Sequence, residues 1–121
     1  MAGRFPLFSD ACVNGILVAA LIRRGWDVRR AIDAFPEGTK DPPLFERAAE
    51  EGRVFVTNDG PLERMALRWV REGRPFRMIF WRVEDYRAGS IADFVEAFEA
   101  LAATEGDPFL YPIHYLKPRR G

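Results

Sequence analysis

The sequence predicts an α/β fold with three layers, in which helices cover both faces of a central, mainly parallel sheet. Short apolar runs rich in β-branched and aromatic residues alternate with segments whose apolar residues recur at helical spacing. Connections that contain a helix allow successive strands to run parallel. Because such crossovers are right-handed, we expect helices on both faces of one sheet.

Four segments are expected to form strands. The clearest is Val54–Thr57, because its Val-Phe-Val run is bounded by Gly52 and by Asn58-Asp59-Gly60. Pro6 suits a central strand poorly, so the first strand should be short. The chain is expected to form one domain over 1–121, with a turn at 84–89 and with 107–121 as a C-terminal arm or edge strand. The expected strands are 4–9, 26–33, 54–57 and 76–81.

Capping residues mark the ends of the expected helices. Asp41 is suited to be an N-cap, with Pro42 at the first helical position. Ser90 and Asp93 have the spacing of a reciprocal cap. Gly25 follows two arginines and is typical of a helix C-terminus. The expected helices are 13–24, 41–52, 61–72 and 90–106.

Composition excludes several classes of protein. The 121 residues suit one domain, and 48% hydrophobic with 30% charged residues indicates a folded chain. A net charge of zero means that any nucleic-acid binding must use a local patch. One cysteine excludes an internal disulfide, and with one histidine it argues against a Cys/His zinc site. No segment has the length of a membrane span or the pattern of a signal peptide, so a cytoplasmic protein without membrane partners is expected.

Three aspartates fall where a parallel sheet binds ligands. Asp10 follows the first expected strand, Asp59 follows the third, and Asp41 begins the helix before that third strand. Strand ends and the helix starts that follow them share the carboxyl edge of the sheet, so the three side chains are expected to converge. Each also has a purely structural explanation: Asp10 and Asp41 can cap helices, and Asp59 can be a turn residue.

A cluster of three carboxylates would need a cation. Two carboxylates about 5 Å apart repel by roughly 3 kcal/mol at an effective dielectric constant of about 20. Hard oxygen ligands without histidine or cysteine favour Mg²⁺ or Mn²⁺. Such an ion can activate water and stabilise a phosphoryl oxygen, which suits hydrolysis of a phosphodiester.

The chain resembles the PIN-like domain superfamily, and within it the short bacterial PIN-like proteins related to VapC toxins. The motifs cover the first half of the chain, and the second half is similar in topology only. The segments that carry the resemblance are Phe8-Ser-Asp10, Val13-Asn14, Arg23-Arg-Gly-Trp-Asp-Val28, Asp41-Pro-Pro-Leu-Phe-Glu-Arg-Ala48 and Glu51-Gly-Arg-Val-Phe-Val-Thr-Asn-Asp59.

The resemblance implies a three-layer sandwich and a ribonuclease that depends on Mg²⁺ or Mn²⁺. It assigns Asp10, Asp41 and Asp59 as catalytic metal ligands, and Asn14, Thr57 and Asn58 as supporting residues. One implied role is that of the toxin in a toxin–antitoxin pair, with RNA as substrate and an antitoxin as a protein partner. The aromatic residues of the tail over 108–116 are expected to cover the core, and a homodimer contact is the alternative. Ala11 and Pro61 stand where the family often has further acids, so a degraded PIN-like protein that only binds is an alternative.

Arginines offer a candidate surface for RNA. Arg64, Arg68 and Arg71 share one face of the helix after Asp59, and Arg23 is a further candidate from the first helix. They could hold single-stranded or structured RNA through its phosphates. An ordinary solvated helix face explains the same pattern.

A receiver-like signalling domain is a further alternative. It would use Asp59 as phosphoacceptor, Ser90 as the switch hydroxyl and Lys117 as the lysine after the last strand. Cys12 lacks an obvious base and is expected to be a small buried hydrophobe. His114 is a lone histidine in the tail, expected to be packed or exposed without a catalytic role.

Overall fold

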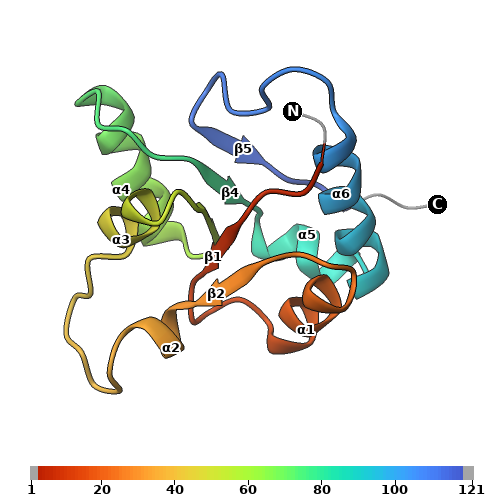
Figure 1. Ribbon diagram of the computed structural model, residues 1–121, viewed down its shortest axis with the longest axis horizontal. Helices are drawn as coiled ribbons and strands as arrows, with labels where there is room; N and C mark the ends of the chain where they lie inside the picture. The colour runs from red at the N-terminus through yellow and green to blue at the C-terminus, as the bar shows by residue number, and fades with distance from the viewer. Residues whose placement is uncertain (1–2, 119–121) are drawn as a thin grey trace.

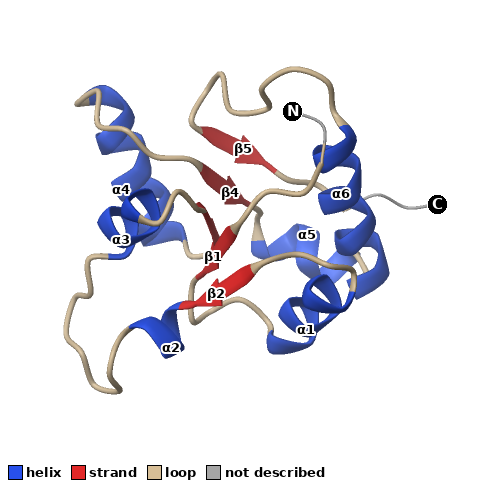
Figure 2. Ribbon diagram, viewed as in Figure 1, coloured by secondary structure: helices blue, strands red, loops and turns tan. Residues whose placement is uncertain are grey.

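The computed structural model describes residues 3–118 and shows a five-stranded, all-parallel sheet between two layers of helices (Figures 1 and 2). The strand order is β2-β1-β3-β4-β5. The strands are β1 (Leu7–Ser9), β2 (Val28–Arg30), β3 (Val54–Thr57), β4 (Met78–Phe80) and β5 (Ile113–Tyr115). The helices are α1 (Gly15–Arg23), α2 (Ala31–Ala34), α3 (Leu44–Glu50), α4 (Gly60–Arg71), α5 (Val83–Ala88) and α6 (Ile91–Ala103). The predicted α/β sandwich with a mainly parallel sheet is therefore confirmed.

Alternate side chains of the strands enter two separate cores. Val54 and Val56 of β3 pack beneath α1 and α6, whereas Phe55 between them packs beneath α3 and α4. This follows from the two-residue period of a strand, which sends successive side chains to opposite faces. Figure 1 shows the consequence, with α3 and α4 on one side of the sheet and α1, α5 and α6 on the other. Helices cover both faces of the sheet, so ligands have access mainly at the amino and carboxyl ends of the strands.

The second strand is shorter than expected. Only Val28–Arg30 pair with β1, and the following Ala31–Ala34 form α2. Two of these four residues are alanine, the strongest helix former, and Ala31 is buried against the face that α3 and α4 cover. The expected strand over 26–33 was therefore wrong at its carboxyl end.

The helix expected from Asp41 begins three residues later, at Leu44, with Pro43 in the N-cap position. Asp41 is exposed and adopts a left-handed backbone, with φ of 48°, and it caps no helix. Two consecutive prolines delay the helix, because each lacks an N–H group and disfavours helical geometry in the residue before it. The assignment of Asp41 as N-cap was wrong.

The carboxyl-terminal half differs from expectation in one segment. The expected turn at 84–89 is α5, a helix of six residues with no buried side chain, which is too short and too exposed to show a hydrophobic period. The reciprocal cap of α6 is confirmed, since Ser90 and Asp93 exchange hydrogen bonds of 3.0 and 3.1 Å. From the expected arm, β5 takes the sheet edge beside β4; residues 119–121 lie outside the described part.

Within residues 3–118, no helix is long and apolar enough to span a membrane.

Candidate functional site

The strand order places a topological switch point between β1 and β3. From β1 the chain first moves to β2 on one side, and β3 then pairs on the other side of β1. In doubly wound sheets, ligands bind in the crevice outside the carboxyl ends of the strands at such a point. Asp10 follows β1 directly, and Asn58 and Asp59 follow β3. The sequence therefore brings two aspartates to the usual ligand position of this fold.

The hydroxyl of Thr57 connects the two aspartates. Its Oγ1 accepts a hydrogen bond from the backbone N–H of Asp59 at 3.1 Å and donates its proton to Oδ2 of Asp10 at 3.0 Å. Thr57 is fully buried in the last position of β3, so this connection is held by the sheet itself. The backbone N–H of Asp10 also donates to the carbonyl of Val56, at 3.0 Å. The carboxylate of Asp10 is thus fixed relative to β3.

Cys12 adds a second contact to the same carboxylate. Its Sγ lies 3.0 Å from Oδ2 of Asp10, 3.0 Å from Oδ1 of Asn58 and 3.4 Å from Oγ1 of Thr57. Burial of the thiol and its hydrogen bond to Asp10 raise the pKa of Cys12, so the protonated, donating thiol is favoured. The residue as a whole is exposed, so the expectation of a buried hydrophobe was wrong.

Asp59 presents a carboxylate without a partner among the described residues. It occupies the N-cap position of α4, but its side chain makes no capping hydrogen bond. The guanidinium of Arg64 folds back over this helix start. Its Nη1 lies 3.7 Å from the point that a β-carbon would occupy if residue 60 were not glycine. Arg64 forms no ion pair within the described residues. A free carboxylate and a free guanidinium therefore flank the start of α4.

Asn14, expected to support the site, is occupied by the first helix. Its Oδ1 accepts hydrogen bonds from the backbone N–H groups of Ile16 at 2.7 Å and Leu17 at 3.4 Å, so Asn14 caps α1. Asp10 is therefore not needed as a helix cap. The Asp10 carboxylate instead accepts hydrogen bonds from the backbone N–H of Ala11 at 2.9 Å and from the Thr57 hydroxyl at 3.0 Å.

Asp41 is not brought together with Asp10 and Asp59. It lies exposed in the loop between α2 and α3, and in residues 3–118 no three side chains of Asp, Glu, His or Cys are grouped closely enough to hold a metal ion. The convergence of three aspartates expected from the sequence is not found. The structure instead links the carboxylate of Asp10 to the backbone N–H of Asp59 through Thr57.

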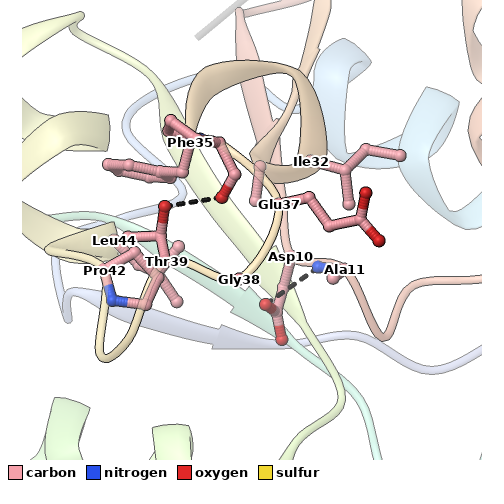
Figure 3. Close-up of a pocket in the computed structure, with 11 residues that line it drawn as sticks. Asp10, Ala11, Ile32, Phe35, Glu37, Gly38, Thr39, Pro42 and Leu44 are labelled. Atoms are coloured by element: carbon pink, nitrogen blue, oxygen red, sulfur yellow. Dashed lines mark hydrogen bonds between the residues drawn. The ribbon is translucent and has the colours of Figure 1, made fainter.

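A cavity of about 540 Å³ opens beside Asp10 (Figure 3). Asp10 and Ala11 form one wall, and α2 with the loop that follows it forms the others. Glu37, which the sequence analysis missed, supplies the second carboxylate. Only the Pro-Glu-Gly turn signal marked that loop, and nothing in the sequence shows that it folds back toward Asp10. The remaining lining residues are Ala31, Ile32, Phe35, Pro36, Gly38, Thr39, Pro42 and Leu44.

The predicted RNA-binding arginines separate into two groups. Arg64 and Arg68 are both exposed on α4, but Arg64 lies near its start at the carboxyl edge, whereas Arg68 is in its last turn, nearer the amino edge. Arg23 is in the last turn of α1, which begins near Asp10 and ends at the opposite edge, and α1 lies in the other helical layer. The structure therefore places Arg64 at the helix start beside Asp59, but neither Arg68 nor Arg23.

The two aspartates fit a hard divalent cation better than a softer one. Among the described residues, the polar side-chain groups hydrogen-bonded to the Asp10 carboxylate are the Thr57 hydroxyl and the Cys12 thiol, with the Asn58 amide oxygen next to that thiol. The protonated thiol donates to the Asp10 carboxylate, which leaves oxygen atoms as the available ligands. Mg²⁺ is commonly held by one or two carboxylates and completes its shell with water and substrate phosphate. Two carboxylates are therefore a sufficient protein contribution for Mg²⁺ or Mn²⁺.

Comparison of the chain with models of protein families, with curated proteins and with solved structures finds no match.

Proposed function

We propose that this chain is a metal-dependent ribonuclease that hydrolyses RNA phosphodiester bonds at the carboxyl edge of its sheet. The observation that carries the proposal is the pair of aspartates at the switch point, where the buried hydroxyl of Thr57 links the Asp10 carboxylate, at 3.0 Å, to the backbone N–H of Asp59, at 3.1 Å. The resemblance to PIN-like proteins supports the same chemistry. Asp10 and Asp59 would hold Mg²⁺ or Mn²⁺.

The residues of the site would have different roles in this reaction. Asp10 and Asp59 supply negative charge, and Thr57 keeps the Asp10 carboxylate in one orientation. A bound divalent cation would neutralise both carboxylates and polarise a phosphodiester oxygen. Arg64, which has no ion-pair partner among the described residues, would hold the neighbouring phosphate of the RNA strand. The Cys12 thiol, which also contacts Asn58, restricts how the Asp10 carboxylate can rotate.

The proposal keeps Asp41 as a third ligand only if the loop between α2 and α3 moves. In its present position Asp41 is exposed and does not line the cavity beside Asp10. A two-aspartate site predicts a smaller loss of activity for Asp41→Asn than for either other substitution. Equal losses for all three would indicate that the loop closes when RNA binds.

The test is cleavage of a panel of labelled RNAs with Mn²⁺ or Mg²⁺. Asp10→Asn and Asp59→Asn should each lower the cleavage rate by more than the roughly 100-fold that loss of an outer-shell partner causes at metal sites. Asp27→Asn is a matched control, because Asp27 is an exposed aspartate before β2, away from the switch point. Equal rates for the wild type and the two site variants would reject the proposal.

A protein that binds RNA or metal without turnover is the second candidate, favoured by Ala11 and Pro61 where related chains often carry acids. It predicts that Mn²⁺ binds, as calorimetry would measure, while no RNA in the panel is cut. Absence of both binding and cleavage in a folded protein would reject both candidates.

A receiver-like phosphoacceptor is the third candidate, because the strand order β2-β1-β3-β4-β5 is that of flavodoxin-like folds and Lys117 follows β5 closely. Against it, Trp81 rather than a hydroxyl residue follows β4, and the Ser90 hydroxyl caps α6. Stable phosphorylation of Asp59 by a small phosphodonor would favour this candidate over the ribonuclease.

A further inference from the structure

The cavity beside Asp10 has the size of a site for one small organic group. Its volume of about 540 Å³ lies within the range of roughly 300–1,000 Å³ typical of ligand pockets. Most of its wall is apolar, from Ile32 and Phe35 on the α2 side to Leu44 at the start of α3. Such walls suit a flat, apolar group that enters from the side of Asp10.

The charges of the cavity exclude a phosphate. Among residues 3–118, Asp10 and Glu37 are the only charged residues that line it, and both are acidic. An anion placed there would be repelled by two carboxylates without a compensating cation. A neutral group that offers N–H donors would instead satisfy them, because an ionised carboxylate accepts hydrogen bonds and donates none.

We propose that this cavity binds the guanine base of an RNA nucleotide whose phosphate lies outside it, beside the divalent cation proposed at Asp10 and Asp59, with Glu37 accepting hydrogen bonds from guanine N1–H and N2–H. This inference rests on the proposed ribonuclease function and adds a base preference to it. In single-stranded RNA an unstacked base can turn away from the backbone and be read on its Watson–Crick edge. The phosphate and the base then occupy adjoining parts of one site.

Guanine is selected by the pattern of its donors. Its Watson–Crick edge carries two adjacent donors, N1–H and N2–H, which match the two oxygens of one carboxylate. Adenine and cytosine each place a ring acceptor beside their amino donor, and uracil has a single N–H between two carbonyl oxygens. Those bases would direct an oxygen or nitrogen lone pair at the Glu37 carboxylate and so form fewer hydrogen bonds with it.

The loop that carries Glu37 is restrained, so the cavity exists before a base binds. Thr39 donates its hydroxyl proton to the carbonyl of Pro36 and closes a turn. Pro36 and Pro42 fix the backbone on either side of that turn. Arg47 covers one face of the Phe35 ring at 4.9 Å from its centroid and holds the ring in place. A preformed site reduces the ordering entropy lost on binding.

The experiment is an NMR titration with guanosine, inosine, adenosine and uridine in the absence of divalent metal. Guanosine should bind at least about tenfold more tightly than uridine, since a bidentate contact typically gives discrimination of this order. Inosine lacks the amino group and should fall between them. Glu37→Gln should abolish the preference, whereas Glu50→Gln should leave it intact, because Glu50 is an exposed carboxylate of α3 that does not line the cavity.

Equal affinity for guanosine and uridine would overturn the inference. The same holds if no nucleoside shifts the resonances of cavity residues, or if Glu37→Gln keeps the full preference. Nucleosides contain no scissile bond and need no metal, so this result is independent of cleavage. Guanosine preference without any RNA cleavage would reject the proposed function alone, and cleavage without base preference would reject only the guanine site.

Discussion

The amino and carboxyl edges of the sheet, where the strands begin and end, differ in how their charged side chains are paired. Every ion pair within residues 3–118 includes a residue on the amino side of the strands: Arg4, Arg24, Glu51, Arg53 or Arg74. On the carboxyl side, Asp10, Glu37, Asp59, Arg64 and Lys117 form no ion pair with any described residue. The ion pairs of the described residues therefore gather at the amino edge, and these charges of the carboxyl edge have no ion-pair partner among those residues.

Arg53 shows what pairing achieves at the amino edge. Its guanidinium donates to Glu51 and Asp27 at 3.0 Å each and to the carbonyl of Leu7 at 3.2 Å. These contacts link the starts of β1, β2 and β3 at their amino ends. The unpaired charges at the carboxyl edge form no such links between strands. Charged groups that are held close together without a compensating partner are typical of functional sites. The comparison assigns stability to one edge and ligand binding to the other.

The largest expected effect is on the carboxyl edge. Mn²⁺ at 100 times its dissociation constant should raise the free energy of unfolding of the wild type by about 2.7 kcal/mol, because it binds only the folded chain. Asp10→Asn should remove most of that gain, and Asp27→Asn should retain it. Thermal or urea denaturation with and without Mn²⁺ measures both. An equal gain in Asp10→Asn would show that the metal binds elsewhere.

The next effect concerns the amino edge. Arg53→Met should lower the free energy of unfolding by about 2 kcal/mol, because it leaves a carbonyl and two carboxylates without their shared donor. Arg68→Met, which removes an exposed arginine without an ion pair, should change it by less than about 0.5 kcal/mol. Urea denaturation gives both values. The rate of RNA cleavage per folded molecule should be unchanged in Arg53→Met. A large decrease in that rate would contradict the assignment of stability to the amino edge and of ligand binding to the carboxyl edge.

A smaller effect is expected when one unpaired cation is removed. Arg64→Ala should weaken binding of single-stranded RNA several-fold and lower the slope of log K against log salt by about 0.7, the value for one phosphate contact. Arg74→Ala is the control, because Arg74 is at the amino side, pairs with Glu46 and stacks on Trp69 at 3.5 Å. Fluorescence anisotropy at several salt concentrations, on an Asp10→Asn background, measures the slope. Identical slopes for the two variants would contradict the comparison.

Features that depend on local periodicity could be predicted from the sequence. The strand Val54–Thr57 is found as expected, because its β-branched residues and its Gly and Asn-Asp-Gly boundaries act locally. The α6 cap is also local, since Ser90 and Asp93 are three residues apart. Asp10 and Asp59 reach one edge because parallel strands all end there.

Features that depend on loop conformation could not be predicted in this way. The position of Asp41 is set by its left-handed backbone and by the two prolines after it, neither of which shows as a period. Glu37 reaches the cavity only because its loop folds back over α2. Cys12 meets Asn58 across 46 positions of sequence, so the contact requires the register of β1 against β3. The positions of the two aspartates that follow strands could thus be predicted from the sequence, whereas the positions of the site residues in loops could not.

The smallest effect comes from His114, the only histidine, which lies in β5 between the two edges. Burial lowers the pKa of His114 below its usual value of 6.5, because the imidazolium form loses hydration. The unfolded chain then binds the proton more readily, so His114 contributes stability above pH 6.5 that is lost as the pH falls through the folded pKa. His114→Phe should reduce this acid-side loss. NMR titration of the single imidazole, folded and in urea, measures both pKa values, and a folded value at or above the unfolded one would show that a charge on β5 is stabilised in the folded protein, as charges are at the amino edge.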